Sequence, residues 1–196
     1  MGRAASLLFF LAWLALAPDA SAAPAFEPRI SVHVDRRDEA VAVDTRALLP
    51  VPARVVWEVL TDYDRIAAFV PGLRVSRLVS GAGEPLLLEQ KGAIGVAMFS
   101  FDIEVVARVE ELPFHTIRFE SVAGNMREMR GEWNVEDLEV GSGLRYRLRV
   151  VPGFWVPPVV GPAVIRRNFI EQFDALAREM MRRAAAPVGG GGIPAQ

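Results

Sequence analysis

Groups able to do acid–base or nucleophilic chemistry are scarce among the 196 residues of this chain. Cysteine is absent, which excludes disulfides, thiolate nucleophiles and cysteine-based zinc sites. The two histidines are His33, in a strand of hairpin type, and His115, at a strand start where an exposed position is expected. Asp62 and Asp64 flank Tyr63 and could form a carboxylate pair, but an aspartate at a helix junction normally caps the next turn. We therefore predict no catalytic residue.

Metal-ion and phosphate sites have no better support in the sequence. It contains no three-histidine, HExxH or DxDxDG pattern. The glycine-rich segments 81–83 and 92–95 lack both the spacing and the following helix of a nucleotide-binding loop, so we interpret both as turns. The sequence accordingly predicts neither a bound metal ion nor a cofactor.

Charged residues alternate along two neighbouring segments near the end of the chain. The first set is basic and lies in the clearest strand: Arg145, Arg147 and Arg149. The second set lies on the same face of the preceding strand: Glu128, Arg130 and Glu132. A basic row can bind nucleic acid, but cross-strand ion pairs on a solvated face are the better interpretation here. A formal net charge of −2 also gives no general attraction for nucleic acid, so we expect no such partner.

Apolar side chains of the predicted strands and of the last helix are the better candidates for a site. They form either an ordinary packed core or the lining of a ligand cavity, and residue types alone leave both readings open. Trp133 and Tyr146 each carry one polar atom that needs a partner when buried, so they could orient a carbonyl or hydroxyl group of an apolar ligand. The predicted lining residues are Phe101, Ile103, Phe119, Trp133, Tyr146, Leu148, Ile165, Phe169 and Phe173.

Three further residues are candidates for the edge of such a cavity. Arg166 falls inside the apolar arc of the last helix, at its first turn, where its guanidinium group reaches either the cavity mouth or bulk water. Phe154 and Trp155 lie among three prolines. They either plug the end of the sheet or form an aromatic lip at the cavity mouth, through which an apolar ligand leaves a membrane.

An α+β fold must position these side chains. Residues 30–51 alternate as a β-hairpin or one long bent strand, and apolar spacing predicts a helix over 52–63 with a short second turn at 64–69. Strand periodicity then marks six segments: 73–79, 85–91, 98–111, 115–122, 126–136 and 144–150. A sheet that is polar on one face and apolar on the other is antiparallel. The last helix, 162–183, has an apolar arc of about 160°, which a curved sheet must enclose.

Composition and length indicate one domain with short appendages. With 52% hydrophobic and 23% charged residues, a chain of this length can form one globular core. Residues 1–22 have the features of a secretory signal peptide, including an apolar run of 12 residues that is too short to span a membrane. The remaining predicted parts are a linker (23–29), the domain (30–183) and a disordered tail (184–196). We expect export to the periplasm or secretion.

Three segments carry a resemblance to a known family: 55–63 (VVWEVLTDY), 69–72 (FVPG) and 152–157 (PGFWVP). They resemble the START-like helix-grip (SRPBCC) superfamily, in particular its polyketide cyclase/dehydrase and coenzyme-Q-binding group, over about residues 30–183. The resemblance implies a helix-grip fold, in which a curved antiparallel sheet wraps around a long C-terminal helix and a short helix pair follows the first strand. It also implies a ligand space between sheet and helix, although fold alone does not choose the function.

The resemblance favours a cavity over a packed core. We expect an exported, monomeric protein that binds or carries an apolar small molecule, such as a lipid, an isoprenoid or a quinone-like compound, and that contacts a membrane transiently. Two alternatives stay open: a cyclase or dehydratase acting on a polyketide-like substrate in the same cavity, and a protein-interaction module. The enzyme would need a buried acid or base near Tyr146, which the sequence does not identify.

Overall fold

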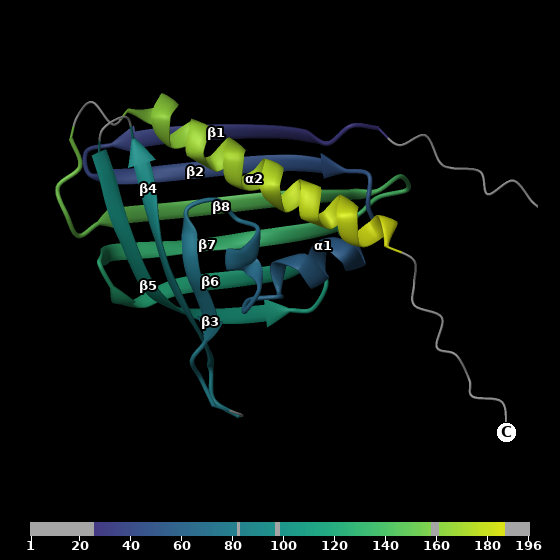
Figure 1. Ribbon diagram of the computed structural model, residues 1–196, viewed down its shortest axis with the longest axis horizontal. Helices are drawn as coiled ribbons and strands as arrows, with labels where there is room; N and C mark the ends of the chain where they lie inside the picture. Colours follow the sequence, from purple (N-terminus) through teal and green to yellow (C-terminus); the bar gives the residue numbers. More distant parts are fainter. Residues whose placement is uncertain (1–25, 82, 97–98, 158–160, 187–196) are drawn as a thin grey trace, which may run out of the picture.

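The computed structural model describes residues 26–81, 83–96, 99–157 and 161–186. In these residues eight strands form one antiparallel sheet, in the order β1-β2-β8-β7-β6-β5-β4-β3. The strands are β1 (Arg29–Arg37), β2 (Ala40–Leu49), β3 (Leu73–Leu78), β4 (Leu86–Val96), β5 (Phe99–Leu112), β6 (Thr116–Gly124), β7 (Met126–Asp137) and β8 (Ser142–Pro152). The sheet is strongly curved, and the long helix α2 (Pro162–Ala185) lies across its concave face (Figure 1).

A short helix and a 3-10 turn carry the chain from β2 to β3, at the opposite edge of the sheet. Helix α1 (Ala53–Leu60) begins directly after Pro52, whose fixed φ suits a helix start. The turn η1 (Ile66–Ala68) follows. The predicted helix and second turn are therefore confirmed with shorter bounds. Because residues 29–49 form a hairpin, the helix pair follows the second strand and not the first.

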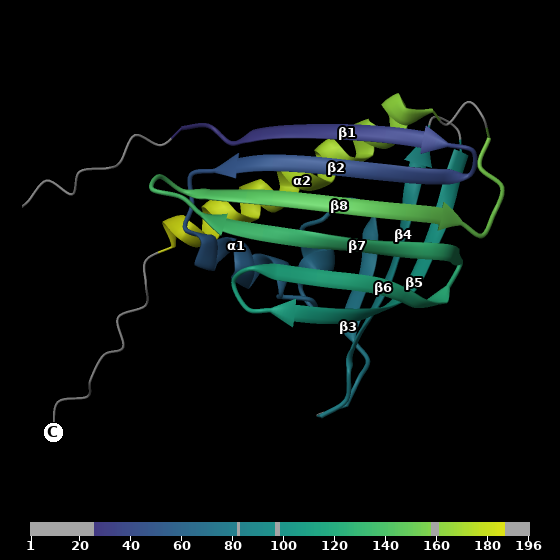
Figure 2. The same cartoon turned by 180° about the vertical axis from the view of Figure 1, so that it is seen from behind.

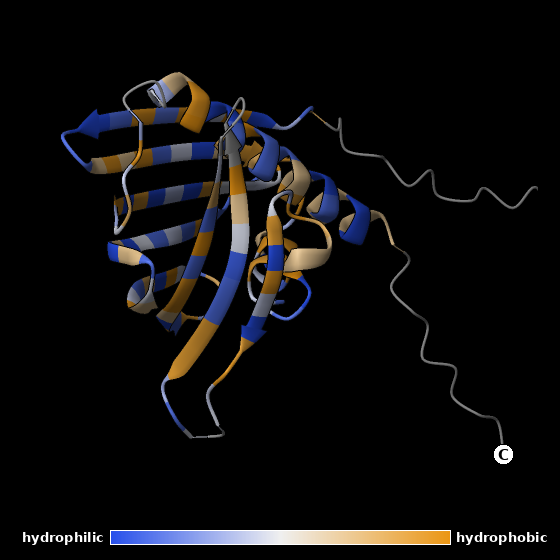
Figure 3. Ribbon diagram, turned by 60° about the vertical axis from the view of Figure 1, so that its left-hand side comes forward, coloured by the Kyte–Doolittle hydropathy of each residue, from blue (hydrophilic) through white to orange (hydrophobic). Residues whose placement is uncertain are grey.

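Side chains alternate between the two faces of the long strands, which appears as alternating bands of hydropathy (Figure 3). On β8, Tyr146 is buried on the concave face, whereas Arg147 and Arg149 are exposed on the outer face. Arg147 pairs with Glu132, and Arg149 Nε lies 3.2 Å from Glu128 Oε1. These contacts confirm the predicted cross-strand ion pairs. Helix α2 lies behind the sheet when the molecule is seen from this outer side (Figure 2).

Helix α2 is inclined to the strands, so its two halves have different neighbours. In the C-terminal half Phe173, Leu176 and Met180 are at most 6% exposed. The N-terminal half packs along the edge strand β1, where Arg166 Nε donates a hydrogen bond to the carbonyl oxygen of Val32 at 2.9 Å. The helix therefore covers one sheet edge with its first turns and the centre of the concave face with its later turns.

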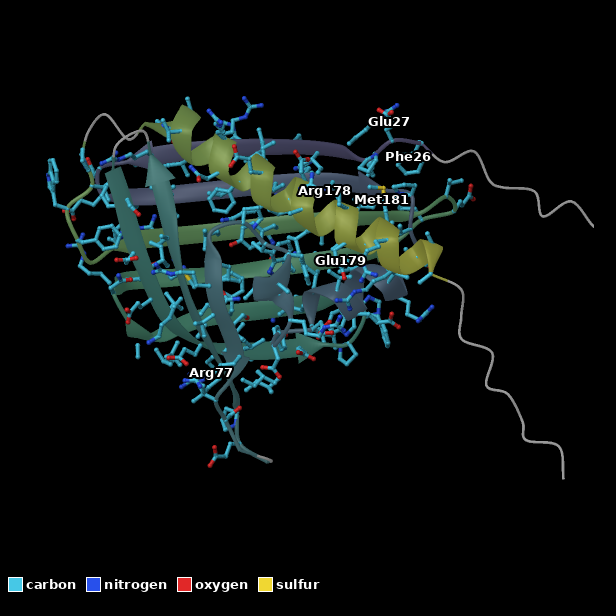
Figure 4. The ribbon with its side chains drawn as sticks, in the orientation of Figure 1. Phe26, Glu27, Arg77, Arg178, Glu179 and Met181 are labelled. Carbon is cyan, nitrogen blue, oxygen red and sulfur yellow. The ribbon has the colours of Figure 1, made fainter. Side chains whose placement is uncertain are left out.

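A charged network fastens the C-terminal end of α2 beside α1. Arg183 donates one hydrogen bond to Asp62 Oδ2 at 2.6 Å and another to Glu179 Oε1 at 2.7 Å. Glu179 projects from the side of α2 that faces α1 (Figure 4). Hydrogen bonding from Arg182, opposed by burial and reinforced by Arg183, lowers the pKa of Glu179 to about 2. Because Asp62 binds Arg183, and Asp64 accepts a hydrogen bond from a β3 amide at 3.0 Å, the predicted capping role of both aspartates is wrong.

The prediction that segment 92–95 forms a turn is also wrong, because these residues continue strand β4. Gly92 pairs with Ile103 of β5, and a side chain at Gly92 would lie 2.4 Å from the backbone oxygen of Gly72. The glycine is therefore required for close approach of two backbones within the sheet and not for a change of chain direction.

Two predicted appendages fall largely outside the described residues. The predicted signal peptide (1–22) lies wholly outside them, as does the tail beyond residue 186. Of the predicted linker, residues 26–29 are described, and β1 begins at Arg29. Helix α2 extends to Ala185, two residues past the predicted end of the domain. Among the described helices, none combines the length and the apolar character needed to cross a membrane.

Candidate functional site

A cavity of about 250 Å³ lies between the concave face of the sheet and α2. Strands β4 to β8 form one side of it, and the segment from η1 to the start of β3 closes another. From α2 it is lined by residues at the spacing i, i+3, i+4 and i+7: Phe169, Gln172, Phe173 and Leu176. The hairpin of β4 and β5 contributes mainly aliphatic side chains: Leu88, Ile94, Ile103, Val105, Ala107 and Val109.

Five aromatic rings form a continuous cluster along the cavity: Phe119, Trp133, Tyr146, Phe169 and Phe173. Tyr146 is at its centre, with ring centroids 4.1 Å from Trp133 and 5.7 Å from Phe173. These separations are near or within the range in which aromatic pairs attract each other beyond simple burial. The cluster joins β6, β7 and β8 to α2, so it forms a continuous surface against which a flat ligand can pack.

Gly131 explains how Phe119 reaches this cluster. Gly131 lies on β7 opposite Phe119, and its missing side chain leaves the space that the Phe119 ring occupies. A Cβ atom at Gly131 would lie 2.5 Å from Phe119 Cζ and 2.4 Å from the backbone oxygen of Arg147. Any larger residue at this position must displace the ring or the strand, so the glycine positions part of the cavity lining.

Polar groups in the cavity are few and uncharged. Tyr146 is only 8% exposed, and burial raises the pKa of its phenol. Across the described residues neither the Tyr146 hydroxyl nor the Gln172 amide has a hydrogen-bond partner in the protein. Gln90 donates to Ser76 Oγ at 3.3 Å. The cavity therefore offers a phenol and a carboxamide whose hydrogen bonds remain to be made.

The phenol of Tyr63 also lines the cavity, but its hydroxyl already donates a hydrogen bond within the protein. The Tyr63 hydroxyl donates to Glu111 Oε1 at 2.6 Å. Burial, together with this hydrogen bond to a carboxylate, raises the pKa of Tyr63. Glu111 is itself exposed at the end of β5 and does not line the cavity. Tyr63 therefore links the segment after α1 to the sheet, and its hydroxyl proton is not free for a ligand.

The predicted lining residues divide into two groups. Those that face the cavity are Ile103, Phe119, Trp133, Tyr146, Phe169 and Phe173. Leu148 and Ile165 instead pack against the apolar cluster of β1 and β2, beneath the first turns of α2. Arg166 is engaged by the β1 carbonyl described above. These three residues lie outside the cavity because the N-terminal half of α2 covers the sheet edge.

Phe101 and the two predicted mouth residues also lie outside the lining. Phe154 stacks on Phe101 at the end of the sheet, with ring centroids 5.8 Å apart and planes 13° apart. Trp155, beside them, is 75% exposed. The three residues border a separate open groove of about 530 Å³. Phe154 therefore covers the start of β5, as a plug would, whereas Trp155 projects into solvent.

Several lining residues were missed by sequence reasoning. Gln90 lies within the predicted strand 85–91 but was missed because only apolar side chains were considered as lining. Ile94 was missed because the predicted strand ends at residue 91, although the alternation Leu88, Gln90, Gly92 and Ile94 continues across the glycine. Gln172 lies seven residues after Ile165, about 20° from it at 100° per residue, so a helical wheel places it at the border of the apolar arc. By contrast, no local pattern indicated that the segment of Ile66 and Val70 would close the cavity.

Neither histidine takes part in this site. His33 is exposed on β1, and His115 is exposed in the turn between β5 and β6. Within the described ranges no group of three or more histidine, aspartate or glutamate side chains is placed to hold a metal ion. A wider hollow of about 610 Å³ exists on the outer face, where charged side chains such as Arg147 and Glu132 line it and pair with each other.

Comparison with protein families gives one match. The profile described as polyketide cyclase / dehydrase and lipid transport matches residues 49–177, which include α1, β3 to β8 and most of α2. No curated protein matches the sequence.

Solved structures with the same fold include proteins of two kinds. A STAR-related lipid transfer protein from Xanthomonas axonopodis is 15% identical over 78% of this chain and 98% of that chain, with a TM-score of 0.57. The Zhui aromatase/cyclase from Streptomyces sp. R1128 is 17% identical over 83% of this chain and 99% of that chain, with a TM-score of 0.55.

A third structure, the di-domain ARO/CYC BexL from the BE-7585A biosynthetic pathway, is 14% identical over 77% of this chain, with a TM-score of 0.56. This chain spans about half (52%) of that protein. At such identities the likeness shows the fold alone. It confirms the predicted α+β helix-grip architecture.

Proposed function

This chain belongs to the family of polyketide cyclase/dehydrase and lipid transport proteins, and from that premise we propose that it binds or carries an apolar small molecule. The ligand would occupy the cavity between the sheet and α2. The observation that carries this proposal is the chemistry of the lining, in which aromatic and aliphatic side chains surround a few uncharged polar groups. Most small-molecule sites have this composition.

Burial of apolar surface supplies the binding energy in this proposal. A ring system the size of an aromatic side chain buries about 150–250 Å². At about 25 cal/mol per Å² this corresponds to about 4–6 kcal/mol before the cost of association is subtracted. The rings of Trp133, Tyr146 and Phe173 are already packed together, so little side-chain entropy is lost when a ligand binds beside them.

The lining supports a binding role better than acid–base catalysis. Among the described residues that line the cavity, the groups able to exchange a proton are the phenols of Tyr63 and Tyr146. Burial raises the pKa of both phenols, so neither is a base near neutral pH. A cyclase or dehydratase that removes a proton from its substrate needs a base beside it. We therefore propose a carrier and not an enzyme.

Export and membrane contact form part of the proposal. The features of residues 1–22 support cleavage by signal peptidase and a periplasmic or secreted location. The exposed indole of Trp155 supports transient contact with a lipid surface, because tryptophan is favoured at the membrane interface. We propose that the mature protein acts as a monomer, which sedimentation equilibrium would test.

Native mass spectrometry of protein purified from the exported fraction tests the proposal. The expected result is a chain that begins near residue 23 and carries a noncovalent small molecule, which solvent extraction releases for identification. Protein that is empty, and that also takes up no apolar compound from vesicles, would contradict the carrier role. Protein recovered from the cytosol with residues 1–22 retained would contradict export.

A further inference from the structure

The structure assigns a narrower ligand class to this cavity: a compact, uncharged ring compound with one oxygen or nitrogen that exchanges a hydrogen bond with Tyr146 or Gln172. This inference rests on the proposed binding function and names its ligand class. It excludes free fatty acids and other anions as preferred ligands. Three features of the described residues support it: the charge of the lining, the size of the cavity and the placement of its unpaired polar groups.

Charge is the first of these features. None of the described residues that line the cavity is ionised at neutral pH. A carboxylate or phosphate placed there would lose its hydration without gaining a cationic partner, which is strongly unfavourable. The cavity therefore discriminates against anionic ligands.

Size and shape are the second feature. At about 250 Å³ the cavity is smaller than the roughly 300–1,000 Å³ of pockets for drug-sized ligands. One side of it is the aromatic cluster, in which Tyr146 and Phe119 are nearly parallel, with an interplanar angle of 18°. Flat rings gain offset-stacked or edge-to-face contacts with such a surface. One or two fused rings therefore match the cavity better than an extended acyl chain does.

Unpaired polar groups are the third feature. Gln172 lies on α2 between Phe169 and Phe173, and the rings of both phenylalanines contact Tyr146. The Tyr146 hydroxyl and the Gln172 amide thus belong to one section of the cavity, and in the described residues neither has a protein partner. A hydrogen bond to either group adds to the apolar contacts, so a ligand that pairs with one of them binds more tightly than its hydrocarbon analogue.

Equilibrium dialysis with four probes at pH 7 tests this inference: naphthalene, 2-naphthol, 2-naphthoate and palmitate. The three ring compounds share one skeleton and differ only in the polar group. We expect 2-naphthol to bind about fivefold more tightly than naphthalene, the gain from one net hydrogen bond. We expect 2-naphthoate and palmitate to bind at least tenfold more weakly than 2-naphthol.

Two variants locate the source of this preference. Tyr146→Phe removes the unpaired hydroxyl, so its affinities for 2-naphthol and naphthalene should differ by less than twofold, whatever its affinity for naphthalene itself. Thr45→Val is the matched control, because Thr45 pairs with Tyr146 in the sheet register and also has a buried, unpaired hydroxyl, but does not line the cavity. It should keep the fivefold preference. Gln172→Leu provides an independent second test and should also reduce the preference.

The failures of the two proposals are distinguishable. If none of the four probes binds the parent protein, the proposed binding function fails, and this inference fails with it. If the ring compounds bind but 2-naphthoate or palmitate matches 2-naphthol, the binding function stands and the assigned ligand class is wrong. An unchanged preference in both Tyr146→Phe and Gln172→Leu would likewise overturn the assignment.

Discussion

Replacing Glu179 by glutamine should destabilise the protein in a pH-dependent way. Glu179 is 10% exposed and accepts hydrogen bonds from Arg182 and Arg183 within α2. It thereby holds Arg183, which in turn binds Asp62 beside α1. Its pKa falls from an ordinary value of 4.5 to about 2. A change of this size sets a ceiling of about 3 kcal/mol on the stabilisation, and solvent screening of the exposed Arg182 reduces the expected loss to about 1.5 kcal/mol.

The pH dependence of this effect follows from the direction of the pKa change. Because the folded-state pKa is lowered, the carboxylate contributes its full stabilisation above about pH 4.5 and loses it as the pH falls towards 2. Urea unfolding of the parent and of Glu179→Gln should therefore differ by about 1.5 kcal/mol at pH 7 and by much less near pH 2.

A control on the same helix isolates the role of the network. Glu171 forms an exposed pair with Arg167 at 3.0 Å, with the two side chains 51% and 81% exposed. Glu171→Gln should cost at most about 0.5 kcal/mol at any pH. Equal effects of the two substitutions at pH 7, or a Glu179→Gln effect that persists undiminished at pH 2, would refute the reasoning.

Three other substitutions have distinct expected outcomes. Gly131→Ala should lower the free energy of unfolding by about 2 kcal/mol and weaken ligand uptake, because the new Cβ displaces Phe119 or the strand. Calorimetry measures the Tm and a titration measures the affinity, and unchanged values would contradict the role of the glycine. Arg166→Ala should lower the free energy of unfolding by about 1 kcal/mol, because the hydrogen bond to β1 is lost, and should leave ligand affinity unchanged. Weakened ligand binding would show that Arg166 contributes to the cavity. Trp155→Ala should reduce partitioning onto neutral phospholipid vesicles about tenfold in a sedimentation assay, and equal partitioning would exclude Trp155 from membrane contact.

The aromatic half of the cavity was predictable because both of its periodicities are local. Phe119, Trp133 and Tyr146 alternate with charged or polar residues along single strands, and Phe169 and Phe173 recur at helical spacing. A period of two or of 3.6 residues is enough to assign each side chain to a face. The ion pairs of the outer face were predictable for the same reason.

The other half of the cavity depends on contacts between segments far apart in the sequence. Ile66 and Val70 reach it because the chain crosses from one sheet edge to the other, and Gly72 and Gly92 allow two backbones to meet closely there. Ile165 was misplaced because the tilt of α2 over the sheet, which decides what each turn covers, leaves no mark in helical periodicity. Local pattern therefore predicts which face a residue belongs to, but not which part of that face is left unfilled.

A cavity-filling substitution tests most directly whether the space between sheet and helix is the ligand site. Ala107 lines the cavity from β5, whereas its neighbour Val106 lies on the other face of the same strand. Ala107→Phe should remain folded and bind naphthalene at least tenfold more weakly than the parent protein in equilibrium dialysis, because the new ring occupies part of the roughly 250 Å³. Val106→Phe places the same ring outside and should bind like the parent. Folded Ala107→Phe protein that keeps the parent's affinity would contradict the account.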